Sequence, residues 1–272
     1  MKNKSKLLAS PYIIWSVAFI IIPLCVIFFY GFTDRSGAFT LDNIKSIGTD
    51  EHIKALLLSL LLSFISTVLC LLLGYPLAAV LTKMNTNSHS MIVFIFILPM
   101  WMNFLLRTLA WQTLLEKTGV INSVLTALHM PTLNIINTSY AIVLGMVYNF
   151  LPFMVLPLYN ALTKIDPNVI NAARDLGANN VQTFFKITLP LTIPGIISGI
   201  TMVFVPALTT FVISNLLGGS KILLIGNVIE EQFTQASNWN LGSGLSIVLM
   251  LFIFLSMIVT SMFDKDGEGT MI

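Results

Sequence analysis

The stretch "NAARDLGANNVQTFFKITLP", residues 171–190, lies between two strongly apolar segments of the chain. It is polar, it begins with a helical pattern, and it ends in Leu-Pro where apolar sequence resumes. A chain made mostly of hydrocarbon side chains has no packing reason to keep such a segment outside its apolar spans. The role of this segment therefore depends on what surrounds it and on what it contacts.

The composition of the whole chain is that of a membrane protein. Of its 272 residues, 56% are hydrophobic and 10% are charged, with a mean hydropathy of +0.89. Soluble domains carry roughly 25% charged residues. The formal net charge of +2 is too small to indicate a nucleic-acid partner. Cys25 and Cys70 lie in apolar runs without neighbours at metal-ligand spacing, so we expect ordinary hydrophobic side chains there.

Six windows are long and apolar enough to cross a membrane, at about residues 11–32, 56–81, 91–115, 140–162, 187–213 and 244–262. Each must be helical because lipid offers no hydrogen-bond partners to an open backbone. Basic residues precede the first window as in a signal peptide, but the window is too long for one and contains Pro23. Prolines in or near the windows are expected to mark kinks or ends. We therefore predict an all-α membrane protein with six transmembrane helices, the first of them retained.

Lysines and arginines in the loops predict the orientation, because cytoplasmic loops carry an excess of them. With the N-terminus inside, eight lie on the cytoplasmic side and five outside. The cytoplasmic residues are Lys2, Lys4, Lys6, Lys83, Lys164, Arg174, Lys186 and Lys265, and the outer ones are Arg35, Lys45, Lys54, Lys117 and Lys221. Both termini are then cytoplasmic. The predicted regions are a tail at 1–10, a first span at 11–32, a five-helix core at 55–262 with a cytoplasmic loop at 164–187, and a tail at 263–272.

Two outer segments, "TGVINSVLTALHM" (118–130) and "LLIGNVIEEQF" (223–233), have apolar residues at helical spacing, which is typical of short interfacial helices. The glycine-serine runs at 218–220 and 242–244 are interpreted as loop punctuation at membrane boundaries. Glu230 and Glu231 either attract a cationic solute, contact an external protein, or form a solvated acidic pair.

Motifs for catalysis and nucleotide binding are missing from the sequence. It contains no Walker A loop, no glycine-rich dinucleotide fingerprint, and no H-E-x-x-H, C-x-x-C or G-x-S-x-G pattern. An intramembrane enzyme concentrates ionisable residues at bilayer depth, and here only Arg107 lies inside a window. We therefore expect no catalytic residue, metal or cofactor in this chain, and whatever energy source drives it, we expect that the chain does not bind ATP itself. A membrane scaffold and an intramembrane enzyme are two classes of function that remain open for such a chain.

The quoted segment predicts a helix with defined ends. Asp166 suits an N-cap and Pro167 the first helical position, while Gly177 suits a left-handed C-cap. Between them an apolar stripe recurs at helical spacing, formed by Val169, Ala172, Ala173 and Leu176. A second helical segment, 181–187, then leads to the membrane. The first helix fits either a groove on another protein or the lipid headgroups.

The same stretch resembles the signature of membrane subunits of ATP-binding-cassette importers: E-A-A, three residues, Gly, nine residues, I-x-L-P. The matching positions are Ala172, Ala173, Gly177, Ile187, Leu189 and Pro190. Asn171 stands where the family usually has Glu, so it can accept a hydrogen bond but cannot form an ion pair. The resemblance implies the type I importer permease fold and a coupling helix that docks in a groove of the ATPase subunit. The implied ATPase-coupling residues are Asn171, Ala172, Ala173, Arg174, Asp175, Gly177, Leu189 and Pro190.

The resemblance covers nearly the whole chain. Three segments, at 99–125, 148–178 and 215–233, resemble the first permease subunit of spermidine/putrescine importers. This implies transport of polyamines by alternating access in the cell membrane of a prokaryote. The implied partners are a homologous second permease, two copies of an ATP-binding ATPase subunit, an external polyamine-binding protein and membrane lipid. Importers of iron, thiamine, sulfate or phosphonates share the signature, so these solutes remain the alternatives.

Polar residues inside the windows are the candidates for the translocation path, because such residues face protein or water rather than lipid. Asn103, Arg107 and Trp111 are spaced one turn apart in the third window and are expected to share a face. Tyr148 and Asn149 lie in the fourth window. Arg107 would repel a cationic solute, so a structural pairing is the favoured interpretation. Trp111 is alternatively an anchor at the membrane interface.

Overall fold

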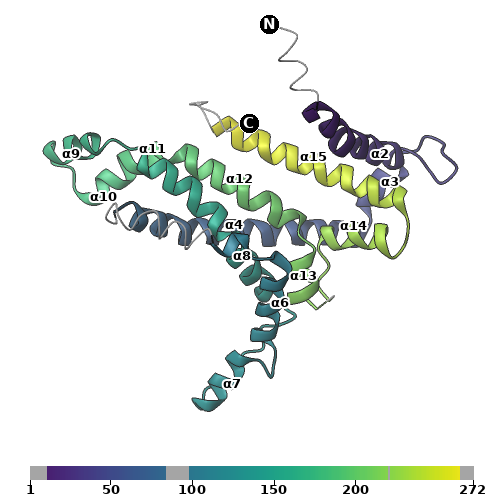
Figure 1. The fold of residues 1–272 in the computed structure, drawn as a ribbon, viewed down its shortest axis with the longest axis horizontal. Coiled ribbons are helices and arrows are strands. Elements are labelled where there is room, and N and C mark those ends of the chain that lie inside the picture. Colours follow the sequence, from purple (N-terminus) through teal and green to yellow (C-terminus); the bar gives the residue numbers. More distant parts are fainter. Residues whose placement is uncertain (1–10, 84–97, 220, 264–272) are drawn as a thin grey trace, which may run out of the picture. The chain divides into compact units, whose positions relative to one another are not determined.

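The computed structural model describes residues 11–83, 98–219 and 221–263, and this part of the chain consists of helices joined by loops, with one isolated bridge between Thr33 and Phe39. The chain order of the helices can be followed in Figure 1. Their bounds are η1 (Val17–Ile21), α2 (Ile22–Gly31), α3 (Asp42–Lys45), η2 (Ser46–Gly48), α4 (Asp50–Lys83), α6 (Phe104–Leu115), α7 (Val120–Ala127), α8 (Ser139–Thr163), α9 (Pro167–Asp175), α10 (Asn180–Thr183), η3 (Phe184–Thr188), α11 (Leu189–Leu191), α12 (Ile193–Thr209), α13 (Val212–Leu217), α14 (Ile225–Thr234) and α15 (Trp239–Phe263).

Four helices of the described chain are long and apolar enough to cross a membrane: Pro11–Gly31, Asp50–Lys83, Ser139–Thr163 and Trp239–Met262. A fifth is added if the bent pair Asn180–Leu191 and Ile193–Thr209 forms one span. These helices confirm the first, second, fourth and sixth predicted windows, and the fifth window corresponds to the bent pair. Part of the third window lies outside the described residues, as do the tails, so the count of six remains a prediction.

The last long helix begins five residues earlier than predicted, at Trp239 instead of 244. The interpretation of 242–244 as loop punctuation was wrong, because these residues lie inside α15. Gly244 is required for packing: a Cβ there would lie 2.6 Å from the Cβ of Asn43 and 2.7 Å from its carbonyl oxygen. The glycine thus permits close approach of two backbones and does not mark a turn.

Contacts divide the chain into two compact units. One comprises Met1–Ala55 and Val228–Leu255, and the other comprises Leu56–Asn227 and Ser256–Ile272. The second unit contains α8, α12 and the polar stretch from which the sequence argument began. Within it, α9 and α10 lie at one end and α7 at another (Figure 1).

Helices α8 and α12 pack closely on each other, and glycines on α12 explain their approach. A Cβ at Gly195 would lie 2.8 Å from the carbonyl oxygen of Pro157, and a Cβ at Gly199 would lie 2.6 Å from the sulfur of Met154. Gly195 and Gly199 are four residues apart, the small-residue spacing that lets membrane helices touch along their backbones.

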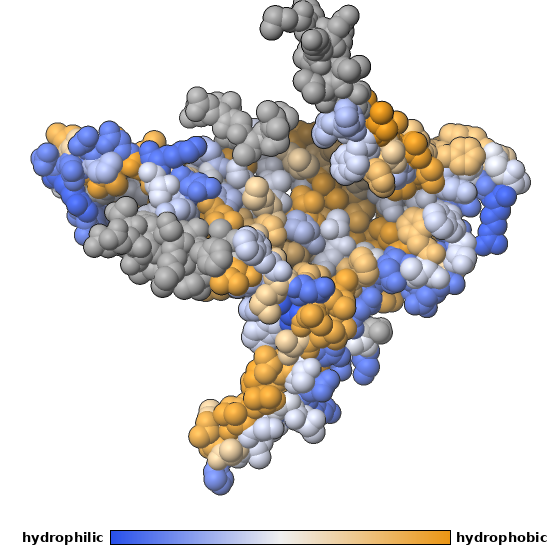
Figure 2. Space-filling view, viewed as in Figure 1, coloured by the Kyte–Doolittle hydropathy of each residue, from blue (hydrophilic) through white to orange (hydrophobic). Residues whose placement is uncertain are grey.

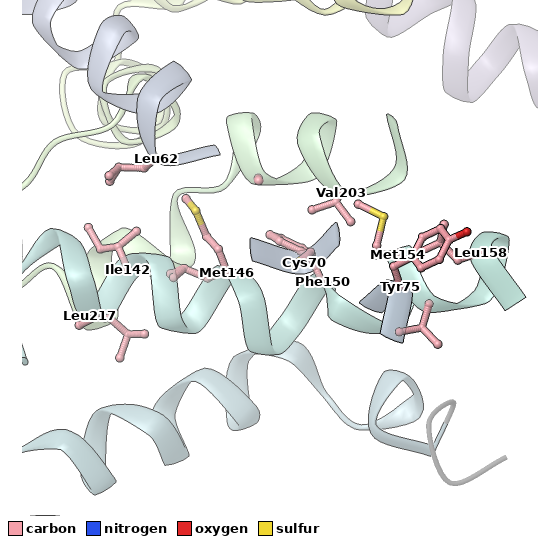
Figure 3. Packing of buried hydrophobic residues seen from close by; sticks show 14 of the residues in the cluster. Leu62, Cys70, Tyr75, Ile142, Met146, Phe150, Met154, Leu158, Val203 and Leu217 are labelled. Atoms are coloured by element: carbon pink, nitrogen blue, oxygen red, sulfur yellow. The ribbon is translucent and has the colours of Figure 1, made fainter. Parts of the chain in front are cut away.

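The buried core of this unit is apolar and comes from several helices (Figure 3). Helix α4 contributes Leu62, Cys70 and Tyr75, while α8 contributes Ile142, Met146, Phe150, Met154 and Leu158, joined by Val203 of α12 and Leu217 of α13. Cys70 is fully buried among them, as expected for an ordinary hydrophobic side chain.

A buried asparagine fixes the turn between α13 and α14. The side-chain oxygen of Asn227 accepts hydrogen bonds from the hydroxyl of Ser214 (2.6 Å) and the amide of Leu224 (3.0 Å). Its amide nitrogen donates to the carbonyl of Phe211 (3.1 Å) and to the side-chain oxygen of Asn215 (2.6 Å). The polar atoms of this side chain are therefore satisfied although only 3% of the residue is exposed.

Candidate functional site

Helix α9 begins and ends as the sequence predicts. Asp166 is the N-cap, and its carboxylate accepts a hydrogen bond of 2.9 Å from the backbone N–H of Asn168. Pro167 occupies the first helical position, where the missing N–H costs nothing. Gly177 adopts a φ of +85° just beyond the helix, which confirms the left-handed conformation expected there.

The C-terminal end of α9 is closed by a pair of backbone hydrogen bonds. The N–H of Gly177 donates to the carbonyl of Arg174 (2.9 Å), and the N–H of Ala178 donates to the carbonyl of Ala173 (3.0 Å). This pattern is the Schellman motif, which satisfies carbonyls that would otherwise lack partners at a helix end. The chain therefore leaves α9 in a fixed direction.

A second helix start follows within two residues and was missed in the sequence analysis. The side chain of Asn179 accepts from the N–H of Gln182 (2.8 Å), and the side chain of Gln182 accepts from the N–H of Asn179 (3.0 Å). This is a capping box at the start of α10. The spacing Asn-x-x-Gln at 179–182 was the signal that would have revealed it.

Helix α9 has two different faces. Ala173 is buried (7% exposed), whereas Val169 and Leu176 are 44% and 89% exposed. Asn171 and Ala172 are also exposed. The two alanines of the signature therefore do not share an environment: one packs on the chain itself and the other faces outward. The exposed apolar side chains lack a covering element within the described residues.

The charged residues in the last turn of α9 are exposed. Asp175 is exposed, and the guanidinium of Arg174 donates a hydrogen bond of 3.4 Å to the side-chain oxygen of Asn180. In the space-filling view this end of the unit is mostly hydrophilic, with small apolar spots, in contrast to the hydrophobic stripe along α7 (Figure 2). The surface is thus polar with isolated apolar side chains, which suits a reversible protein contact more than burial in lipid.

The path candidates fall into different environments. Asn103 lies before α6 as its N-cap, and its side chain accepts from the N–H groups of Leu105 (2.9 Å) and Leu106 (3.2 Å). The expectation that it shares a helical face with Arg107 and Trp111 is wrong, because the helix begins only at Phe104.

Trp111 and Tyr148 are brought together. Their rings meet edge-to-face with centroids 5.2 Å apart. Both line a groove of about 450 Å³ whose walls come from α4, α6 and α8. The other lining residues are Leu69, Leu73, Tyr140, Val143, Leu144, Val147 and Leu151. The groove is almost entirely apolar, and neither Asn103, Arg107 nor Asn149 lines it.

Arg107 and Asn149 are buried, at 6% and 1% exposure. The amide nitrogen of Asn149 donates to the carbonyl of Gly145 (2.9 Å) and to the hydroxyl of Thr108 (3.5 Å). The Nε and Nη1 atoms of Arg107 and the side-chain oxygen of Asn149 have no hydrogen-bond partner among the described residues. Arg107 is therefore enclosed by this chain and does not line the groove.

Several described helices are long and apolar enough to cross a membrane, and comparison with known proteins identifies the family of the chain. The chain belongs to the binding-protein-dependent transport system inner membrane components, whose family model matches residues 7–266. This confirms the resemblance inferred from the 171–190 stretch.

Individual relatives are similar along nearly their full length. The chain is 37% identical over 266 residues to the spermidine/putrescine transport system permease protein PotB of Haemophilus influenzae, covering 93% of each chain. It is 40% identical over 253 residues to PotB of Escherichia coli K12, covering 90% of this chain and 92% of the relative. A bacterial ABC transporter that imports the acidic polysaccharide alginate contains a chain with a TM-score of 0.80 at 19% identity, covering 98% of both. The last likeness shows the fold alone.

Proposed function

We propose that this chain is a permease subunit of an ATP-driven importer of spermidine and putrescine. The observation that carries the proposal is the identity of 37–40% to curated permeases of that transport system along at least 90% of the chain. The apolar helices supply the membrane passage, and the loop at 164–187 supplies an ordered polar contact surface.

In this proposal the surface formed by α9, α10 and the turn between them at Gly177, called the α9–α10 corner, docks on the ATPase. Three features support it: both helices have capped starts, the turn between them is closed by backbone hydrogen bonds, and Val169 and Leu176 remain exposed. Asn171 takes the place of the usual glutamate, so it contributes a hydrogen bond instead of an ion pair. The predicted topology, with six spans and both termini cytoplasmic, puts this corner on the ATPase side.

The finer partner assignments belong to the same proposal. A homologous second permease completes the membrane pathway, two copies of an ATPase subunit bind and hydrolyse ATP, and an external binding protein delivers polyamine. The chain itself acts without a catalytic residue, metal or cofactor. Alternating access then requires the two permeases to change their relative orientation when the ATPases close.

Trp111 and Tyr148 are the path candidates that the geometry favours, since both line one groove. Aromatic faces attract ammonium groups, and the apolar walls suit the methylene chains of a polyamine. Asn103 and Asn149 are engaged within the fold as a helix cap and as a buried hydrogen-bond donor. Arg107 lies outside the path in this proposal, as a buried charge that does not line the groove.

The test is ATP hydrolysis by the reconstituted complex of this chain, its second permease, the ATPase and the binding protein. Stimulation by spermidine or putrescine, but not by thiamine or ferric iron, is the expected result. Hydrolysis that responds to another solute instead would retain the importer and reject polyamine as the substrate. A complex that never assembles with the ATPase would favour a non-transporting scaffold.

A further inference from the structure

A sharp corner separates the α10 segment from α12. The chain bends by 63° between the helical segments Asn180–Leu191 and Ile193–Thr209. Thr192 lies at the corner with φ −97° and ψ 0°, and it caps the helices on both sides. Pro194 cannot donate to the carbonyl of Pro190 four residues earlier, and its ring would clash with that carbonyl in a straight helix. The chain must therefore bend here, and contacts made by Thr192 determine how firmly the bend is held.

The hydroxyl of Tyr75 reaches this corner from α4. It lies 2.9 Å from the Oγ1 of Thr192, and the two residues are 9% and 0% exposed. The Thr192 hydroxyl also donates to the carbonyl of Leu189 at 3.0 Å. Because a threonine hydroxyl has a single proton, Tyr75 must donate the bond between the two hydroxyls. The Tyr75 hydroxyl then donates to Thr192, and the Thr192 hydroxyl donates to the carbonyl of Leu189.

The ring of Tyr75 also contacts the arm that precedes the corner. It packs edge-to-face on Phe184, with centroids 5.5 Å apart and planes at 88°. Phe184 begins η3, the π-helical segment between α10 and the corner. Figure 3 shows the same ring beside Leu158 of α8. One side chain of α4 thus contacts the corner and the segment leading into it.

The segment after the corner is fixed to α8. A Cβ at Gly195 would clash with the Cβ of Ala161 and would lie 2.8 Å from the carbonyl oxygen of Pro157. Helix α12 therefore packs directly on the backbone of α8 from its first turn. On the path from α10 to α12, the break at Thr192 is the point where a displacement of the loop can be absorbed as bending.

We propose that Tyr75 is a positioning residue for energy coupling: its hydroxyl and ring lock the corner at Thr192. Displacement of the α9–α10 segment is then transmitted to α12 and α8 instead of being absorbed as bending. This inference rests on the proposed function and extends it, because it assigns the transmission to a residue outside the coupling loop. Without these contacts of Tyr75, ATP hydrolysis continues, but the transporter moves less solute in each cycle.

The experiment measures polyamine taken up per ATP hydrolysed by the full complex in liposomes. Tyr75→Phe and Thr192→Val each remove one of the two hydroxyls, and with it the bond between them, with little change of volume. We expect hydrolysis to persist while the uptake per ATP falls roughly two- to tenfold, the range for one hydrogen bond. The double variant falls no further than Thr192→Val alone, because that variant already removes the bond between the hydroxyls together with the bond to the carbonyl of Leu189. Thr192→Ser keeps the hydroxyl and should retain the wild-type ratio of uptake to ATP hydrolysis.

Tyr12→Phe is the matched control, since Tyr12 is 70% exposed, and it should leave the ratio unchanged. An unchanged ratio in Tyr75→Phe and Thr192→Val, or losses that add in the double variant, would overturn the proposal. Parallel loss of hydrolysis and uptake with a lowered Tm would also overturn it, since that result indicates a structural role. Failure of the wild-type complex to respond to polyamine refutes the substrate assignment instead, and the ratio is then measured with the solute that does stimulate hydrolysis.

Discussion

Replacing Gly177 with alanine perturbs the α9–α10 corner with the smallest possible change. Gly177 has a φ of +85°, and a Cβ built there meets no atom within 4 Å. Steric clash is therefore absent, and the cost is the left-handed backbone alone, about 1–2 kcal/mol for an L-residue. Alanine must either keep this strain or lose the two backbone hydrogen bonds that close α9.

The assay is the affinity of the purified ATPase subunit for the permease pair in detergent. If the turn relaxes in the free variant and docking requires the native turn, restoring it costs that strain on binding, and Kd rises by up to roughly 5- to 30-fold. Gly177→Asn should lose less affinity, since asparagine adopts the left-handed conformation more readily. Gly48→Ala is the control, because a Cβ at Gly48 also meets no atom within 4 Å and its φ is not in the left-handed region.

Two results would refute the reasoning. Wild-type affinity in Gly177→Ala would show that the ATPase does not depend on the geometry of this corner. An equal loss of affinity in Gly48→Ala would show that the effect comes from the added methyl group and not from the backbone conformation. A Tm measurement on each variant separates a local change in the corner from general unfolding.

Two further predictions concern buried polar groups. Asn227→Ala removes both hydrogen-bonding groups of a residue that is 3% exposed and leaves its partners buried. The free energy of unfolding should therefore fall by about 3 kcal/mol or more. Thermal unfolding should show a lowered Tm, whereas Asn160→Ala at an exposed site should leave the Tm unchanged. Arg107→Met removes a buried cation whose Nε and Nη1 atoms lack partners among the described residues, and it should leave the Tm of the purified complex equal or higher because an apolar side chain avoids the desolvation cost. A clearly lowered Tm in Arg107→Met would show that the guanidinium has a partner elsewhere.

The features that the sequence predicted correctly depend on neighbouring residues. Asp166, Pro167 and Gly177 determine the ends of α9 through cap chemistry and backbone conformation within a few positions. Long apolar runs likewise predict the long helices, because the lipid environment admits little else. Such signals need no knowledge of the tertiary fold.

The features that it did not predict depend on distant contacts. The bond between Tyr75 and Thr192 joins residues 117 positions apart, and their sequence separation gives no sign of it. Gly244 looks like a turn residue until the backbone of Asn43 is placed against it. In both cases packing outweighed local pattern. Asn103 is different, because its side chain caps α6 through the nearby N–H groups of Leu105 and Leu106, a local signal that the helical spacing concealed.

The order within the α9–α10 loop bears on how energy reaches the membrane helices. Helix α9 has nine residues, fewer than the roughly 12–15 that an isolated helix needs to be stable in water. Its caps, the closed turn and the burial of Ala173 supply the missing stability within this chain. A partner that binds this surface therefore does not have to order it, which avoids an entropic cost on binding. More of the free energy of ATPase closure then remains to displace the loop, and the corner at Thr192 determines how much of that displacement reaches α12.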